Sequence, residues 1–131
     1  MLVGFLILVQ NGLLVRILIV DDQPELAELL AWSLRENNIP ALAFTSALQL
    51  LRMIRTNDVL VTDYAMPEMT GLEMARQAYH GGWRGPLFLM SGTFDPRSLA
   101  FDSPPVRFFL PKPFPVKDLI RMLPSGMPPP D

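Results

Sequence analysis

The sequence predicts an α/β fold in which helices cover both faces of an open parallel sheet. Short apolar runs alternate along the chain with segments of helical periodicity, which is the pattern of repeated βα units. The run over residues 58–62 is apolar without alternation, as expected for a strand that is buried on both faces. The chain has 131 residues, of which half are hydrophobic, so it fits one domain with a sizeable core.

The first half of the chain predicts two strands, each followed by a helix. A strand over residues 16–20 precedes a helix that opens at Pro24, because proline is tolerated at the first helical position. This helix carries leucines at helical spacing, namely Leu26, Leu29, Leu30 and Leu34. A second strand over 41–44 leads to a helix that Ser46 and Gln49 would open as a capping box.

The second half predicts three further strands, separated and followed by helices. The expected strands cover residues 58–62, 86–90 and 106–110. Long helices are expected over 71–80, closed by Gly81 and Gly82, and over 115–123. Between them, residues 94–101 predict only a short helix, which the run Ser103-Pro104-Pro105 breaks. Trp32 and Trp83 have no motif around them and are expected to pack in the core.

These elements predict a flavodoxin-like (βα)5 sheet with strand order 2-1-3-4-5. In this order the last strand is an edge of the sheet. Pro111 at the end of that strand has no backbone N–H to donate to a neighbouring strand. Proline is acceptable there because the strand is an edge.

The chain divides into an apolar extension (1–15), the α/β domain (16–124) and a proline-rich tail (125–131). The extension is too short to span a bilayer, which takes ~20 residues, and no positive charge precedes it as in a signal peptide. Asn11-Gly12 is a hairpin signal between two apolar runs. A hairpin onto the first, central strand would compete with the parallel neighbours of that strand. Two interpretations of the extension stay open. It is a misassigned translation start or an adventitious extension, or else it is an added strand or a self-association element.

The composition excludes several classes of protein. A net charge of -2 gives no polybasic surface for nucleic acid or for an anionic membrane. The absence of cysteine excludes disulfides and thiolate metal sites.

Polar residues gather at the ends of four predicted strands. Asp21 and Asp22 follow the first strand, Asp63 ends the third, Ser91 the fourth, and Lys112 follows the fifth. The carboxyl ends of parallel strands form one crevice, where ligands bind. Three crowded carboxylates repel one another and call for a cation, while a lysine and a hydroxyl suit the oxygens of a phosphoryl group.

This arrangement resembles the receiver domain of response regulators in two-component signalling. The matching motifs are Ile19-Val-Asp-Asp22, Asp63-Tyr-Ala-Met-Pro67 with Gly71-Leu-Glu73, Met90-Ser-Gly92 and Lys112-Pro-Phe114. The resemblance implies that Asp63 is the phosphoacceptor. It also implies a Mg²⁺ site, with Asp22 as a direct ligand, Asp21 acting through water, and Asp63 and the backbone carbonyl of Ala65 completing the set.

The resemblance assigns roles to three further residues. Ser91 and Lys112 would bind the phosphoryl group, and Ser91 and Phe109 would form the switch. Members of the family often have a cis bond after this lysine, here before Pro113. His80, the only histidine, ends a helix beside two glycines, where it suits the last carbonyls better than a phosphorelay.

The function implied is a cytoplasmic signalling switch that accepts a phosphoryl group from a sensor histidine kinase or phosphotransfer protein. Output would pass through contacts with a downstream protein, without direct DNA binding or membrane insertion, because no effector domain follows in this sequence. Such a protein would catalyse only its own phosphorylation and dephosphorylation.

Two alternatives come from other classes of protein. A phosphorylation-independent binding module would fit the irregular stretch from 94 to 105. A phosphatase of the haloacid-dehalogenase type shares the aspartate, lysine and hydroxyl, but typically has a second acid where this chain has Ala65.

Each site residue also has a structural interpretation. Asp63 could be a turn residue, Asp22 a helix cap, Ser91 the cap of a helix near Phe94, Lys112 a solvated lysine and Phe109 a core aromatic.

Overall fold

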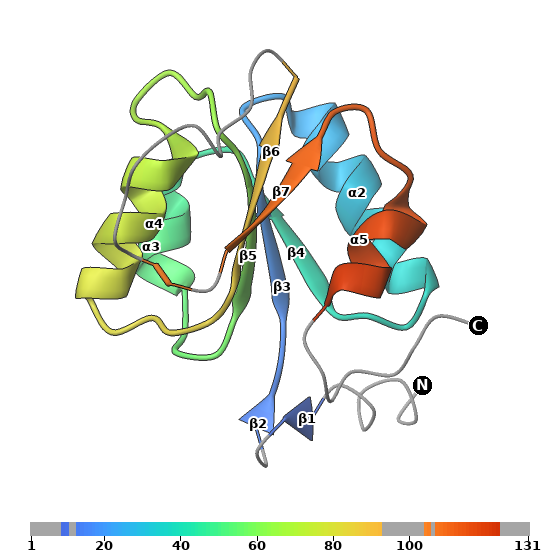
Figure 1. Cartoon of the computed structure of the whole chain (residues 1–131), viewed down its shortest axis with the longest axis horizontal. Helices are drawn as coiled ribbons and strands as arrows, with labels where there is room; N and C mark the ends of the chain where they lie inside the picture. Colours follow the sequence, from blue (N-terminus) through green and yellow to red (C-terminus); the bar gives the residue numbers. More distant parts are fainter. Residues whose placement is uncertain (1–8, 11–12, 93–103, 106, 124–131) are drawn as a thin grey trace.

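The computed structural model describes residues 9–10, 13–92, 104–105 and 107–123 (Figure 1). Its main element is a five-stranded parallel sheet with the order β4-β3-β5-β6-β7. The strands are β3 (Ile17–Val20), β4 (Ala41–Phe44), β5 (Val59–Asp63), β6 (Leu87–Ser91) and β7 (Arg107–Pro111). This is the predicted order 2-1-3-4-5, so the flavodoxin-like fold is confirmed.

Among the described residues, helices lie on both faces of the sheet, one pair on each face (Figure 1). The first pair is α2 (Pro24–Glu36) and α5 (Val116–Met122), and the second is α3 (Ala47–Met53) and α4 (Gly71–His80). Alternate residues of β3 divide between the two layers, with Ile17 and Ile19 facing α2, and Leu18 and Val20 facing the opposite side. Because both faces are covered, all four residues of β3 are buried.

The helix ends carry the signals read from the sequence. Pro24 is the first residue of α2, and Ser46 Oγ accepts a hydrogen bond from the Gln49 N–H at 3.2 Å. Thr70 caps α4 in the same way, accepting from the Glu73 N–H at 3.1 Å. After α4 the chain reverses at Gly82, whose φ of 115° is favourable only for glycine.

β7 is an edge strand of the described sheet, and Pro111 is its last residue, as predicted. Phe108 and Phe109 on this strand pack into different layers. Phe108 stacks on Phe88 with ring centroids 4.7 Å apart, whereas Phe109 packs against the layer of α3 and α4.

A buried polar cluster joins the amino ends of the strands. Asp58 is 2 % exposed and accepts two hydrogen bonds from Arg16, at 3.0 and 2.7 Å. Its backbone carbonyl accepts from the indole N–H of Trp83 at 2.7 Å, so the prediction that Trp83 is buried is confirmed. The same prediction for Trp32 is wrong, because Trp32 lies on the outer side of α2 and is 55 % exposed.

The N-terminal segment forms a small sheet of its own. β1 (Val9–Gln10) pairs antiparallel with β2 (Leu13–Leu14), in the arrangement that a hairpin at Asn11-Gly12 predicts. This pair does not join the five-stranded sheet, so it leaves the neighbours of β3 in place. The turn itself, the short helix expected over 94–101 and the tail 125–131 lie outside the described residues. No helix within the described ranges is long and apolar enough to cross a membrane.

Candidate functional site

Three carboxylates meet at the carboxyl ends of β3 and β5. Asp21 and Asp22 directly follow β3, and Asp63 is the last residue of β5. One carboxylate oxygen from each residue lies within 4.8 Å of the other two. Asp21 is buried, Asp63 is half-buried and Asp22 is exposed, so the cluster opens to solvent on the side of Asp22.

Lys112 bridges two of these carboxylates. Its Nζ lies 3.0 Å from Asp21 Oδ2 and 3.4 Å from Asp63 Oδ1. Its backbone N–H donates to the carbonyl of Ser91 at 2.9 Å, which ties the loop after β7 to the end of β6. The peptide bond from Lys112 to Pro113 is cis, as the family resemblance implied. The structure thus holds Lys112 in place, and it is not a solvated surface lysine.

The electrostatics of the cluster favour an added cation. Burial raises the pKa of Asp63, and the charges of Asp21 and Asp22 raise it further, against the opposing effect of Lys112. Burial lowers the pKa of Lys112, but its hydrogen bond to Asp21 and the two neighbouring carboxylates outweigh this and leave that pKa raised. Three acids against one lysine leave an excess of negative charge that a bound cation would offset.

The donor set fits Mg²⁺. It consists only of oxygens, which this hard cation prefers, and one side of the cluster is open for the waters that Mg²⁺ retains. Ala65 lies exposed in the loop between β5 and α4, two residues after Asp63. Asp22 is not a cap of α2, because the N-cap position is Gln23 and no side chain caps the helix there. Asp21 Oδ1 instead accepts from the Gln23 N–H at 3.0 Å.

The loop that carries Asp63 is fixed by contacts from three sides. The Tyr64 N–H donates to the carbonyl of Met90 at 2.8 Å, and the Tyr64 carbonyl accepts from the Gly71 N–H at 2.8 Å. Thr62 Oγ1 donates to the carbonyl of Asp63 at 2.9 Å. The sequence interpretation did not single out Thr62, although a hydroxyl in an otherwise apolar strand is a visible signal.

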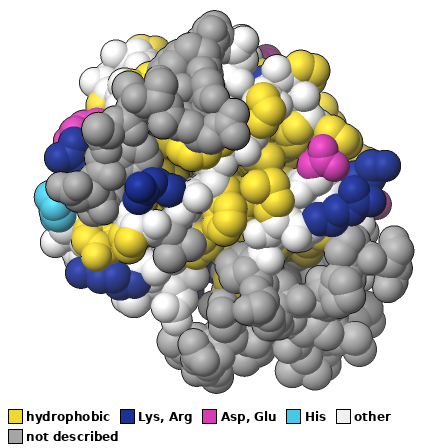
Figure 2. Space-filling view, viewed as in Figure 1, with side chains coloured by type: hydrophobic (Ala, Val, Ile, Leu, Met, Phe, Trp, Pro, Cys, Tyr) yellow, Lys and Arg dark blue, Asp and Glu magenta, His cyan; other side chains and the backbone are white. Residues whose placement is uncertain are grey.

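Ser91 and Phe109 lie on neighbouring strands. Ser91 is buried at the end of β6 and stands opposite Pro111 in the ladder with β7. Phe109 is half-buried and lines a shallow hollow of about 370 Å³ between β7 and α5. Hydrophobic side chains gather over this side of the molecule (Figure 2). A cap role for Ser91 on the predicted helix near Phe94 concerns residues outside the described part.

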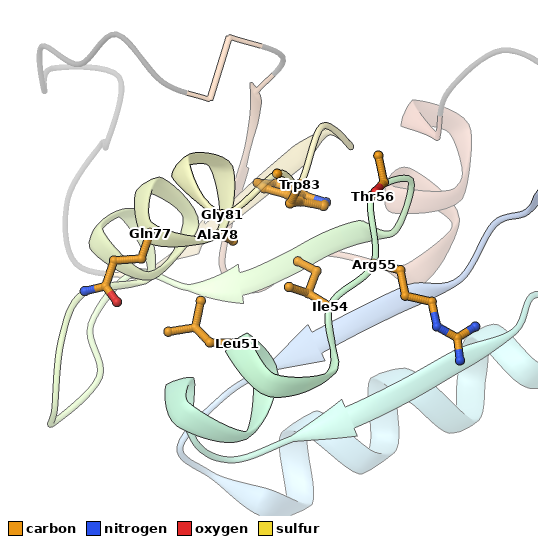
Figure 3. Close-up of a pocket in the computed structure, with 9 residues that line it drawn as sticks. Leu51, Ile54, Arg55, Thr56, Gln77, Ala78, Gly81 and Trp83 are labelled. Atoms are coloured by element: carbon orange, nitrogen blue, oxygen red, sulfur yellow. The ribbon is translucent and has the colours of Figure 1, made fainter.

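Two further hollows lie near the described elements. A largely apolar groove of about 420 Å³ runs between α2 and the loop after β7, and Asp21 and Lys112 line one end of it. A more polar hollow of about 510 Å³ lies where α3 and α4 end, beside Trp83 (Figure 3). This second hollow is at the amino ends of β5 and β6, so it contains none of the predicted site residues.

Comparison with known proteins gives one consistent family. The model of the response regulator receiver domain matches residues 17–124. The response regulator MprA of Mycobacterium ulcerans is 33% identical over 113 residues, which are 83% of this chain and 48% of that protein. The chain therefore spans about half the length of such curated relatives.

Solved structures agree with this family. The response regulator TrrA of Thermotoga maritima, described as a complex with Mg²⁺ and BeF, has a TM-score of 0.68 at 26% identity, covering 79% of this chain and 91% of that one. A response regulator receiver protein of Sinorhizobium medicae has a TM-score of 0.68 at 25% identity, covering 82% of this chain and 89% of that one.

Proposed function

The chain belongs to the response regulator receiver domain family, whose members signal through phosphorylation, and we propose that it accepts a phosphoryl group on Asp63 with Mg²⁺. The observation that carries this proposal is the placement of the Asp63 carboxylate between two other acids and Lys112, at the open end of a parallel sheet. Receiver domains are signalling switches rather than typical enzymes, which argues against the phosphatase alternative.

The proposed chemistry is the in-line transfer of a phosphoryl group from an oxygen or nitrogen atom of the donor to an oxygen atom of Asp63. A carboxylate oxygen of Asp63 forms a bond to phosphorus while the bond from phosphorus to the donor atom breaks. The donor atom leaves with the bonding electron pair, and an aspartyl phosphate remains. The transferred group is close to metaphosphate in character, so catalysis depends on positioning and charge neutralisation.

The residues of this chain would supply both the positioning and the charge neutralisation. Mg²⁺, when bound, would offset the charge that gathers between the carboxylates and the phosphoryl oxygens. Asp22 and Asp63 would hold it directly, the carbonyl of Ala65 would contribute a further oxygen, and Asp21 would act through water. Lys112 is already within 3.4 Å of Asp63 and would pair with the phosphoryl oxygens after transfer. Ser91 would donate a hydrogen bond to the same group.

A surface beside the site supports a protein donor, either a sensor histidine kinase or a phosphotransfer protein in the cytoplasm. The outer side of α2 exposes Leu29 by 58 % and Trp32 by 55 %. The apolar groove between α2 and the loop after β7 continues from this surface to Lys112. Exposed apolar surface of this kind suits a protein contact, and its position would bring a donor group to Asp63.

Output is proposed to pass through the β7 and α5 side of the molecule. The aspartyl phosphate would carry a charge of about -1.5 to -2 in place of the single negative charge of the carboxylate, together with strong acceptor oxygens. These would draw Ser91 and the Lys112 loop toward Asp63. Phe109 lies between the layer of α3 and α4 and the hollow beside α5. A change in its packing would alter a surface that a downstream protein contacts.

Phosphorylation by a small donor tests the proposal without the unknown kinase. The protein is incubated with acetyl phosphate, with and without Mg²⁺, and its intact mass is measured. We expect one added phosphoryl group that requires Mg²⁺ and is absent from Asp63→Asn. Asp118→Asn on α5 is the matched control and should be phosphorylated like the wild type. Uptake by Asp63→Asn would refute the assignment of Asp63, and no uptake by the wild type would favour a phosphorylation-independent module.

A further inference from the structure

Thr62 places a hydroxyl inside an apolar layer of the core. The residue has no exposed surface and shares its face of β5 with Leu60. In the sheet it stands between Val20 of β3 and Leu89 of β6, both of which are buried and hydrophobic. Valine has nearly the same shape and would avoid the cost of burying a hydroxyl. Packing alone therefore does not explain threonine at this position.

The contacts of the hydroxyl lead to the loop that carries the phosphoacceptor. Thr62 Oγ1 donates to the backbone carbonyl of Asp63 at 2.9 Å. It also lies 3.9 Å from the sulfur of Met66, which is a weak acceptor. These two partners lie before and after Ala65, so one hydroxyl contacts both sides of the turn over residues 63–66.

The start of α4 closes the same turn from the other side. The Gly71 N–H donates to the carbonyl of Tyr64 at 2.8 Å. A Cβ atom at Gly71 would lie 2.2 Å from the carbonyl oxygen of Asp63 and 2.8 Å from Cγ2 of Thr62. The Asp63 carbonyl is thus enclosed between Thr62 and Gly71, and a rotation of the peptide that follows Asp63 would break the contact with Thr62.

We propose that Thr62 is a positioning residue for the phosphoacceptor loop. Its hydroxyl fixes the peptide between Asp63 and Tyr64, and thereby sets the relative placement of the Asp63 carboxylate and the Ala65 carbonyl. Thr62 itself touches neither a cation nor a phosphoryl group. This inference rests on the proposed function, because it assigns Thr62 to the geometry of the same site.

Two variants separate the hydroxyl from the packing of the side chain. Thr62→Val removes the hydroxyl and keeps the shape, whereas Thr62→Ser keeps the hydroxyl and removes the methyl group. We expect Thr62→Val to raise the Mg²⁺ dissociation constant and to slow phosphorylation by acetyl phosphate. The loss of one hydrogen bond corresponds to about a two- to tenfold change in each quantity. The midpoint of thermal unfolding should stay unchanged or rise, and Thr62→Ser should restore both affinity and rate.

Hydrogen exchange gives a measurement that does not depend on phosphorylation. The Gly71 amide, which donates to Tyr64, should exchange faster in Thr62→Val. The Leu60 amide, which donates to Pro86 away from the loop, is the internal control and should keep its rate. If Thr62→Val does not fold, Thr62→Ala and Thr62→Ser provide the same comparison.

Two results would overturn the inference. One is a Thr62→Val variant in which the Gly71 amide exchanges at the same rate as in the wild type and Mg²⁺ binds with the same affinity. The other is a serine variant as impaired as the valine variant, which would assign the effect to the methyl group. A wild-type protein that takes up no phosphate would reject the proposed function, while Gly71 exchange would still decide the role of Thr62.

Discussion

Replacement of Asp63 by asparagine should stabilise the metal-free protein at neutral pH. Asp63 is half-buried next to Asp21 and Asp22, and Lys112 is the one described cation that opposes their repulsion. Asparagine keeps the shape of the side chain and can still accept a hydrogen bond from Lys112. The substitution therefore removes an unfavourable charge with little change in packing.

The magnitude follows from the charges around Asp63. The carboxylate faces two like charges within 4.8 Å and one opposite charge at 3.4 Å, which leaves one uncompensated repulsion. Such a pair is worth about 1 kcal/mol in water and about 4 kcal/mol near a protein surface, and this open site belongs in the lower part of that range. We expect a gain of about 1–2 kcal/mol, which raises the midpoint of thermal unfolding by about 4–8 °C for a chain of this size.

The gain should depend on pH with a defined sign. The raised pKa of Asp63 means that the folded protein holds this proton more tightly than the unfolded chain. Wild-type stability therefore falls as pH rises from the ordinary value of 3.8 through the raised pKa. The advantage of Asp63→Asn is full above that window and vanishes below it.

Thermal and urea unfolding in chelator, at neutral pH and near pH 3.5, measure this difference. Asp118→Asn removes an equal charge from a half-exposed, 3.8 Å pair with Arg121 and should change stability little. Added Mg²⁺ should stabilise the wild type more than Asp63→Asn, because the variant lacks one of the proposed ligands. A less stable Asp63→Asn at neutral pH, or a gain that persists in acid, would refute the charge argument.

Three further predictions concern other residues of the fold and the site. Asp58→Ala leaves Arg16 without its buried partner and should lower the free energy of unfolding by about 3–5 kcal/mol, without a change in Mg²⁺ affinity by calorimetry. Gly85→Ala would bring a Cβ atom to 1.8 Å from the Asp58 carbonyl oxygen, so urea unfolding should show a loss of at least about 1–3 kcal/mol. Asp22→Ala should weaken Mg²⁺ binding about tenfold or more and raise the melting temperature in chelator, whereas a lower melting temperature would contradict the role of Asp22 as a repelling carboxylate.

The fold could be predicted because its signals are local and repeated. The buried strands are mainly apolar runs. Pro24, Ser46 and Gly82 mark the helix ends where the structure has them. The strands at 58–62 and 86–90 lie one residue further along the chain than predicted. This shift arises because Asp63 and Ser91 still pair in the ladder although they are polar.

Pairings between distant residues could not be predicted in the same way. The ion pair of Arg16 with Asp58 joins residues 42 positions apart, and neither residue belongs to a motif. Lys112 contacts both Asp21, at 3.0 Å, and Asp63, at 3.4 Å, and the sequence alone does not show that the contact with Asp21 is the shorter one. The prediction for Trp32 was wrong for a related reason. When more than one face of a helix is apolar, the sequence does not show which apolar residues stay exposed to solvent.

The two ends of the sheet carry opposite electrostatic arrangements. At the amino ends, Asp58 accepts hydrogen bonds from Arg16 and from the Arg55 N–H, so its buried charge is matched. At the carboxyl ends, three carboxylates share one lysine among the described residues, so negative charge remains unmatched in the absence of a cation. Unfavourable groups of this kind are retained at functional sites and offset elsewhere in a fold. We infer that the cluster around Asp58 supplies stability that the acidic cluster around Asp63 lacks, which is why variants at the two ends are expected to change the stability of the metal-free protein in opposite directions.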